Sequence, residues 1–502
     1  MKSLYSDAEA KKYKTDLDLR VYTSRLLGLD ASLVLHGGGN TSVKSTVMDS
    51  LGNMVDTLLV KGSGWDLETI EAKGFASVRM DALLEMAKQK ELSDEEMVRE
   101  QRAAMIDQSA PNPSVEAILH AIIPFKFVDH THADAVVTIT NTDNGEDKIR
   151  EIFGEKILII PYIMPGFVLA KLVYNMTRDV DWSGLDGMIL MNHGLFTFSD
   201  DAKTSYEKTI ELVDIAQRYL VEKGAVLDIE IQNTAVNLLE LAKIRKEVSA
   251  IKGSAIISVF NDSKEAIYFS KQNIENIATK GPLTPDHVIR TKRVPALLTN
   301  NYKQELQDFV EAYKQYFLAN KRDEILLNPA PNFAILKGEG SLSFGKNAKD
   351  ANIIKDINNH LFEAILKAEM LGGYKALEPK EIFEVEYWSL EQAKLKKSSS
   401  ELEYAGRIAI VVNAMSKKVQ ERALELTKKG AVVIAVDVDC EVEKLFSKTD
   451  IVGMRCDVDN DEDIKSLISF VVKSFGGIDM LFADESLHKK LFKECAPFLE
   501  LS

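Results

Sequence analysis

The sequence predicts an α/β protein built from three domains. Its 502 residues exceed a single domain, since domains typically hold about 100–200 residues. Short β-rich runs alternate with helical patterns up to about residue 222, and the same alternation returns after residue 403. The part between them contains a repeat of the first. We therefore expect domains at residues 1–222, 223–395 and 403–502.

Three segments of the first domain have clear local patterns. Thr57–Val60 and Ala135–Thr140 are apolar and β-branched, which predicts buried strands. Asp200–Val221 begins with a polar cap and continues with helical periodicity, which predicts a long helix.

The repeat appears when the sequence is compared with itself. Residues 189–203 align without gaps to residues 335–349, with matches at Ile, Leu, Gly, Phe, Ala and Lys positions. A weaker similarity relates residues 60–66 to residues 279–286. We interpret residues 223–395 as a second, abbreviated copy of the first domain; the alternative is chance similarity between two strand–turn–helix units.

The last hundred residues have the pattern of a doubly wound parallel sheet. The chain ends at Ser502, so we expect only about half of such a sheet. The predicted strands and helices are Ile408–Val412, Lys417–Lys429, Val432–Asp437, residues 464–475 and Ile478–Phe482.

Charge, cysteine content and the lack of long apolar stretches argue against several classes of protein. A formal net charge of −15 argues against a nucleic-acid binder, which needs a basic surface to displace counterions. The three cysteines are odd in number and clustered near the C-terminal end, which does not indicate a disulfide framework and favours a reducing compartment. Residues 1–20 have no apolar core of a secretory signal, and no apolar stretch is long enough to span a bilayer. We expect a cytoplasmic protein that binds no membrane.

Three of the eight histidines have the spacing of a metal site. His130 and His132 are separated by one residue, and strand side chains at i and i+2 point to the same face. His193 follows an apolar strand end and precedes a glycine that permits a tight turn. Three imidazoles with an open position are typical of a catalytic divalent ion. We predict that these histidines bind zinc, with manganese or iron as alternatives; a solvent-facing strand pair is the other interpretation.

Glu116 is the candidate acid or base. Pro113 and Ser114 are helix-start signals, which place Glu116 in the first turn of a helix shortly before the histidine pair. A carboxylate at that position can move a proton on a substrate bound to the metal. The alternative is a glutamate that only complements the helix dipole.

Two glycine-rich segments are candidates for anion binding. His36–Ser42 and Lys61–Gly64 offer backbone N–H groups and short polar side chains, which together can hold a phosphate. Neither has the spacing of a Walker loop. Ordinary tight turns are the alternative.

Together these segments resemble the class II aldolase/adducin family of sugar-phosphate aldolases. The resemblance runs from about Leu26 to Tyr219, with the motifs in the family's order. It implies that His130, His132 and His193 are the metal ligands and that Glu116 is the catalytic acid/base. It also implies that the substrate phosphate is held by Asn40, Ser63, Gly64 and Ser114.

The whole chain is similar to the group of bifunctional rhamnulose-1-phosphate aldolase/alcohol dehydrogenases. In that group an aldolase is followed by a linking region and a short-chain dehydrogenase, and residues 281–292 and 386–394 resemble its linking segments. Glu339 stands in the repeat where the first copy has His193, so the second copy is expected to be degenerate and inactive.

The dehydrogenase-like part is expected to be truncated and degenerate. Asn413, Asp437 and Asp457 stand where the resemblance places a dinucleotide site, and Ala483–Glu485 replaces its Asn-Ala-Gly element. No glycine occurs between Asn413 and Gln420, and side chains there would block a pyrophosphate. We therefore expect no NAD binding and a structural or assembly role for residues 403–502.

The resemblance implies a metal-dependent aldolase that cleaves a ketose phosphate similar to rhamnulose 1-phosphate. In the expected retro-aldol reaction the metal stabilises the enediolate that develops and Glu116 moves the proton. The family also implies a homo-oligomer. Three alternatives stay open: a bifunctional aldolase and NAD-dependent dehydrogenase, an epimerase or decarboxylase on the same scaffold, and a non-enzymatic adducin-like scaffold.

Overall fold

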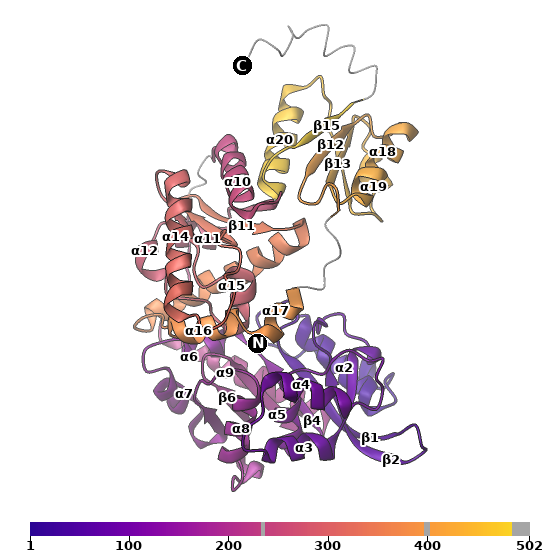
Figure 1. The fold of residues 1–502 in the computed structure, drawn as a ribbon, viewed down its shortest axis with the longest axis vertical. Helices are drawn as coiled ribbons and strands as arrows, with labels where there is room; N and C mark the ends of the chain where they lie inside the picture. The colour runs from indigo at the N-terminus through magenta and orange to yellow at the C-terminus, as the bar shows by residue number, and fades with distance from the viewer. Residues whose placement is uncertain (232–235, 396–401, 484–502) are drawn as a thin grey trace. The chain divides into compact units, whose positions relative to one another are not determined.

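The computed structural model describes residues 1–231, 236–395 and 402–483 (Figure 1). These residues form two compact units, each assembled from separate stretches of the chain. Unit 1 consists of Met1–Asp228, Ile277–Val294 and His360–Lys397. Unit 2 consists of Ile229–Asn276, Pro295–Asn359 and Ser398–Ser502. The division into domains at residues 1–222, 223–395 and 403–502 stays a prediction.

Unit 1 is built on one seven-stranded sheet. Its strand order is β3-β2-β1-β4-β7-β6-β5, and every neighbouring pair is antiparallel except β5 with β6. The strands are β1 (Asn40–Met48), β2 (Met54–Lys61), β3 (Phe75–Arg79), β4 (Phe127–Thr131), β5 (Ile157–Ile160), β6 (Gly187–Leu190) and β7 (Gly194–Ser199).

Helices cover both faces of this sheet. Strand side chains alternate between two buried clusters: Ile189 and Leu195 pack with α2, α6, α7 and α9, whereas Met188 and Phe196 pack with α3, α5 and α8. The result is an αβα arrangement with two cores. The helices are α1 (Asp7–Ala10), α2 (Asp16–Gly28), α3 (Met80–Lys88), α4 (Asp94–Ala103), α5 (Ala117–Ile122), α6 (Asp134–Thr140), α7 (Gly145–Phe153), α8 (Phe167–Met176) and α9 (Ala202–Glu222).

Two of the three local predictions for the first domain are confirmed. Residues 57–60 lie inside β2, and α9 begins after Asp201, whose side chain accepts a hydrogen bond from Thr204 N. The strand predicted at Ala135–Thr140 is wrong, because these residues form α6. The segment is fully buried against α9, and this packing outweighs the strand preference of its β-branched residues.

Unit 1 also contains short helices from the later stretches of the chain. They are α13 (Val288–Thr291), which follows a short 3₁₀ turn at Pro285–His287, α16 (Pro379–Glu386) and α17 (Ser389–Leu395). Val288 packs with Ile382 and Val385 in a small buried cluster of its own.

The second sheet confirms the abbreviated repeat. Its order is β8-β11-β10-β9, with only β9 and β10 parallel, which matches β4-β7-β6-β5 of the first sheet. In both copies the hairpin pairs equivalent residues, Leu190 with Gly194 and Leu336 with Gly340. The strands are β8 (Ile257–Asn261), β9 (Ala296–Leu298), β10 (Phe333–Leu336) and β11 (Gly340–Gly345), and the helices are α10 (Leu238–Lys252), α11 (Lys264–Ser270), α12 (Ile274–Ile277), α14 (Tyr302–Asn320) and α15 (Ala348–Met370).

The weaker similarity between residues 60–66 and 279–286 does not reflect equivalent structures, so this part of the predicted repeat is wrong. Lys61 ends strand β2, whereas residues 279–286 contain no strand and belong to unit 1 itself. The second sheet contains counterparts of four strands of the first, so a partner for β2 is absent among its described residues.

The C-terminal residues of unit 2 form a half-sheet of the doubly wound type. All its strands are parallel in the order β14-β13-β12-β15, with α20 on one side and α18 and α19 on the other (Figure 1). The predicted strands and helices are confirmed, but α19 and β14 lie between residues 437 and 464, where no element was predicted. The elements are β12 (Ile408–Val412), α18 (Lys417–Lys428), β13 (Val432–Asp437), α19 (Val442–Leu445), β14 (Ile451–Arg455), α20 (Asp461–Phe475) and β15 (Met480–Phe482).

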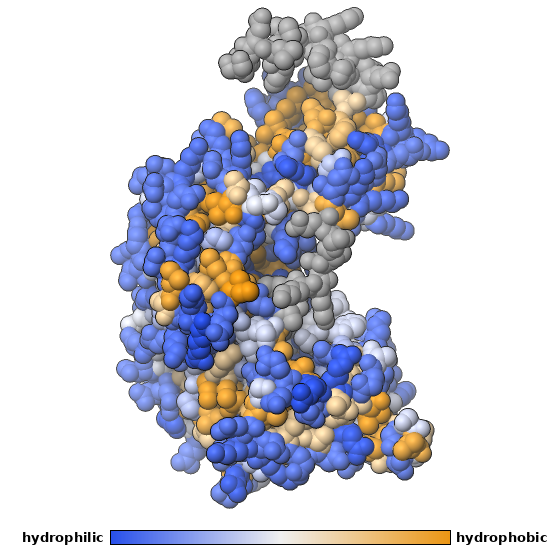
Figure 2. Space-filling model, viewed as in Figure 1, coloured by the Kyte–Doolittle hydropathy of each residue, from blue (hydrophilic) through white to orange (hydrophobic). Residues whose placement is uncertain are grey.

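This half-sheet shares its core with the second copy. Ile257 and Val259 of β8 pack with Ile408 and Ile410 of β12 in one buried cluster. Hydrophobic residues also gather around β15, where Leu481 is exposed (Figure 2). No helix among the described residues is both long and apolar enough to cross a membrane.

Candidate metal centre

Strand register brings the predicted site residues together. Asn40 of β1 pairs with His130 of β4, and His130 pairs with Phe196 of β7. Cross-strand neighbours share a face, so these side chains point to the layer that contains α5. Glu116 is the N-cap residue of α5, one position before the predicted first turn. His193 lies in the turn between β6 and β7.

The imidazoles of His130, His132 and His193 converge on one point. Nε2 of His132 lies 3.1 Å from Nε2 of His130, and one nitrogen of each ring lies within 4.8 Å of the others. Nδ1 of His130 donates to the carbonyl of Leu195 at 3.1 Å, which leaves Nε2 free to bind a metal. Burial lowers the pKa of His132 to about 3 and that of His130 well below its usual value, so both rings are neutral near pH 7.

Glycine is required in the turn that carries His193. A Cβ at Gly194 would lie 2.4 Å from the carbonyl oxygen of Thr131 and 2.9 Å from Cε1 of His130. The absence of a side chain therefore lets β7 approach the histidine pair closely enough for His193 to join it.

A chain of hydrogen bonds fixes the Glu116 carboxylate. Asn40 Nδ2 donates to Glu116 Oε2 at 2.6 Å, so the amide oxygen of Asn40 faces His120 and accepts from its Nε2. His120 Nδ1 in turn accepts from the hydroxyl of Ser42 at 2.8 Å. All four side chains are buried. Burial lowers the pKa of His120 to about 3, consistent with a neutral ring between these two partners.

The donor set fits a divalent cation. Glu116 Oε2 lies 3.5 Å from Nε2 of His130, and Oε1 lies 3.6 Å from Nε2 of His193. Oε1 is buried and has no hydrogen-bond partner among the described residues. A buried carboxylate oxygen without a donor is costly unless a cation or a proton-bearing ligand faces it.

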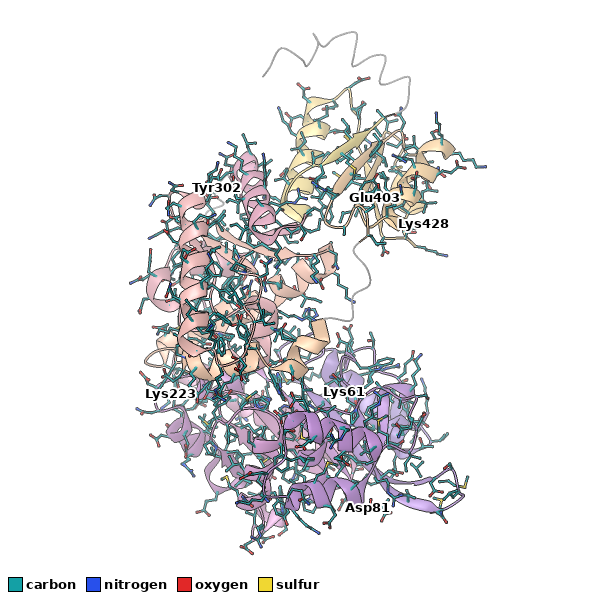
Figure 3. The ribbon with its side chains drawn as sticks, in the orientation of Figure 1. Lys61, Asp81, Lys223, Tyr302, Glu403 and Lys428 are labelled. Atoms are coloured by element: carbon teal, nitrogen blue, oxygen red, sulfur yellow. The ribbon has the colours of Figure 1, made fainter. Side chains whose placement is uncertain are left out.

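The predicted phosphate residues fall into two groups. Ser63, Gly64 and Ser114 lie together, because Gly62 bridges to Pro113 and the Ser63 N–H donates to the carbonyl of Asn112. Lys61, labelled in Figure 3, donates from Nζ to the carbonyls of Gly37 and Gly39 and so ties the two glycine-rich segments to each other. Asn40 differs from the others, since both ends of its amide are engaged by Glu116 and His120.

A buried ion pair supports the opposite face of β4. Arg20 of α2 pairs with Asp129, which immediately precedes His130 on the strand, and both side chains are fully buried. Ser205 of α9 also donates to Asp129. Because residues on a strand alternate in direction, this network anchors β4 from behind while His130 faces the metal centre.

A carboxylate that sequence reasoning missed lies beside His132. Asp286 Oδ1 is 3.5 Å from Nδ1 of His132. Asp286 belongs to the segment 281–292, which the sequence indicated only as a linking segment and as part of the weaker similarity to residues 60–66. No spacing signal connects it to the histidines, because more than a hundred and fifty residues separate Asp286 from His132.

In the region predicted to be a degenerate dinucleotide site, the aspartates accept hydrogen bonds from nearby backbone N–H groups. Asp437 Oδ2 accepts from the N–H of Met415 at 2.9 Å, and Asp457 Oδ1 accepts from the N–H of Asp459 at 3.0 Å. Asn413 has a positive φ of 65°, so the chain turns sharply there without a glycine. In the element Ala483–Glu485, the last two residues lie outside the described part of the chain.

Comparison with known families assigns two stretches of the chain to class II aldolase domains. The family described as "Class II Aldolase and Adducin N-terminal domain" matches residues 19–220, and "Aldolase class II, second domain" matches residues 235–395. The chain belongs to the class II aldolase/adducin family. Glu116 and the three histidines lie within the first of these matches, whereas Asp286 lies within the second.

Individual relatives extend the comparison over the whole chain. The "Uncharacterized oxidoreductase YuxG" of Bacillus subtilis is 28% identical over 97% of this chain and 75% of its own length. "Short-chain dehydrogenase reductase 4" of Arabidopsis thaliana is 28% identical over 20% of this chain and 35% of its own length. The N-terminal class II aldolase domain of a conserved protein from Thermoplasma acidophilum is 44% identical and covers 44% of this chain and 99% of its own, with a TM-score of 0.41.

Proposed function

We propose that this aldolase-family chain is a metal-dependent aldehyde-lyase that cleaves a ketose 1-phosphate by a retro-aldol reaction. A sugar similar to rhamnulose 1-phosphate is the first candidate substrate. The observation that carries the proposal is the convergence of three imidazoles on a buried carboxylate that keeps one oxygen without a partner among the described residues. Family membership supports the reaction class.

Each residue of the site has a separate role in the proposed retro-aldol reaction. His130, His132 and His193 would hold a divalent ion, which would supply Lewis-acid chemistry to the bound substrate. As the carbon–carbon bond breaks, the hydroxyl that becomes the aldehyde gives up its proton, which Glu116 takes up on Oε1. Glu116 then returns a proton to the carbon that the departing aldehyde leaves behind. Asn40 fixes the other oxygen, Oε2, so that Oε1 keeps a defined direction.

Ser63, Gly64 and Ser114 are the proposed phosphate residues. They lie in two adjoining loops, and the segment 112–114 leads directly into Glu116. A phosphate held there would place the sugar chain next to the carboxylate. We assign Asn40 to positioning of Glu116, since its amide is already engaged at both ends.

We infer a structural role for the C-terminal half-sheet. Its core is continuous with β8 of the second copy, so it stabilises unit 2 directly. The side chains between Asn413 and Gln420 occupy the turn in which a dinucleotide pyrophosphate would have to dock.

The test is a screen of ketose 1-phosphates for release of dihydroxyacetone phosphate. With the active sugar, Glu116→Gln should retain the metal and lose at least about a hundredfold in turnover, the usual contribution of a positioned acid or base. Glu85→Gln, at an exposed position of α3, is the matched control and should keep wild-type turnover. Wild-type turnover in Glu116→Gln would reduce Glu116 to a structural role, and no cleavage of any ketose 1-phosphate would overturn the proposal.

A further inference from the structure

The second family domain contributes a segment to unit 1. The stretch Ile277–Val294 packs within the unit that contains the metal centre, although the second-domain family model covers it. Asn141 Nδ2 donates to the carbonyl of Leu283 at 3.2 Å, and the hydroxyl of Tyr374 donates to the carbonyl of Pro282 at 2.8 Å. Asn192, next to His193, donates to Asn141 Oδ1 at 2.9 Å. The segment is thus tied to the loop that carries a metal-site histidine.

This segment places Asp286 behind His132. The Nε2 atom of His132 points to the centre of the histidine cluster, and Nδ1 points the other way, 3.5 Å from Asp286 Oδ1. An imidazole that binds a metal through Nε2 carries its proton on Nδ1 and needs an acceptor there. His130 has such an acceptor in the Leu195 carbonyl. For His132, Asp286 is the group in the matching position.

Asp286 is also available for this task. Its Oδ1 atom is buried and has no hydrogen-bond partner among the described residues. A buried carboxylate oxygen in that state needs a donor, and Nδ1 of His132, which carries the ring proton when Nε2 binds a metal, lies 3.5 Å from it.

We propose that Asp286 is a positioning residue of the metal centre, which orients His132 and raises its affinity for a divalent cation. The metal centre of unit 1 is therefore completed by the second family domain, in which Glu339 stands where the first copy has His193. This inference rests on the proposed metal-dependent function.

The experiment measures binding of Co²⁺ and Zn²⁺ to the metal-free full chain by competition with a chelator, together with the melting temperature of the metal-free protein. Asp286→Ala should weaken affinity about 10–100-fold, the usual effect of losing such an outer partner, and Asp286→Asn should fall between it and wild type. The melting temperature without metal should stay at the wild-type value. The Co²⁺ absorption spectrum of Asp286→Ala should shift, because the orientation of one ligand changes.

Val288→Ala is the matched control from the same segment. Val288 is fully buried, so its truncation should lower the melting temperature and leave metal affinity unchanged. Equal affinity in Asp286→Ala and wild type would overturn the proposal, as would a loss of affinity that merely accompanies a lowered melting temperature. Failure of wild-type protein to bind either ion would instead overturn the proposed function.

Discussion

At the scale of single residues, the site depends on histidines with two distinct tasks. His130, His132 and His193 face one another, whereas His120 links Ser42 to Asn40 and so holds Glu116 from a distance. The sequence predicted the three converging histidines and Glu116, because their spacing has a simple meaning on strands and at helix starts. It could not predict the links through Asn40 and Asp286, since these depend on which strands and segments become neighbours.

His120 should make the folded protein less stable in acid. Its pKa is about 3 in the folded state, compared with 6.5 for an unperturbed histidine, so between these values only the unfolded chain binds the proton. Its contribution to stability is fully present above about pH 6.5 and is lost as pH falls through this window. In urea unfolding of the metal-free protein between pH 4 and 6, His120→Gln should reduce the pH slope of the unfolding free energy by about 1.4 kcal/mol per pH unit.

Ser42→Ala provides the control for this measurement. It removes one hydrogen bond to the ring but keeps the titrating group, so the wild-type slope should persist even if total stability drops. Equal slopes for wild type and His120→Gln would contradict the assignment of a buried, neutral His120.

At the scale of elements, strands and helices with complete local patterns were predictable. The strands Ile408–Val412 and Val432–Asp437 agree with the sequence at both ends, and the hairpin of the repeat keeps its register in both copies. Elements that depend on tertiary contacts were not predictable from the sequence. The helix α6 has strand-like residues, and β14 contains a glycine and a charged end that hide it as a strand.

The turn between β12 and α18 should not bind a dinucleotide. Asp437 is hydrogen-bonded to the backbone of this turn, and every residue from Asn413 to Gln420 has a side chain. Backbone N–H groups there cannot approach a pyrophosphate as a glycine-rich turn allows. Calorimetric titration with NAD or NADP should show no saturable binding at sub-millimolar ligand. A micromolar dissociation constant for either nucleotide would favour the bifunctional alternative.

At the scale of the whole molecule, the chain combines one complete aldolase-type sheet with an abbreviated copy and half of a doubly wound sheet. In the abbreviated copy, Glu339 occupies the position that corresponds to His193. Its neighbouring segment nevertheless supplies Asp286 to unit 1. The proposed positioning role of Asp286 therefore links the second family domain to the histidine cluster of the first.

Metal content of the purified full chain tests the central claim most directly. Wild-type protein should contain about one divalent ion per chain, and a chelator should remove both the ion and the aldol cleavage until the ion is restored. His132→Ala should contain no stoichiometric ion, whereas His360→Gln, which changes a histidine of unit 1 outside the cluster, should retain it. Full metal occupancy in His132→Ala, or undiminished cleavage by metal-free wild type, would contradict the account.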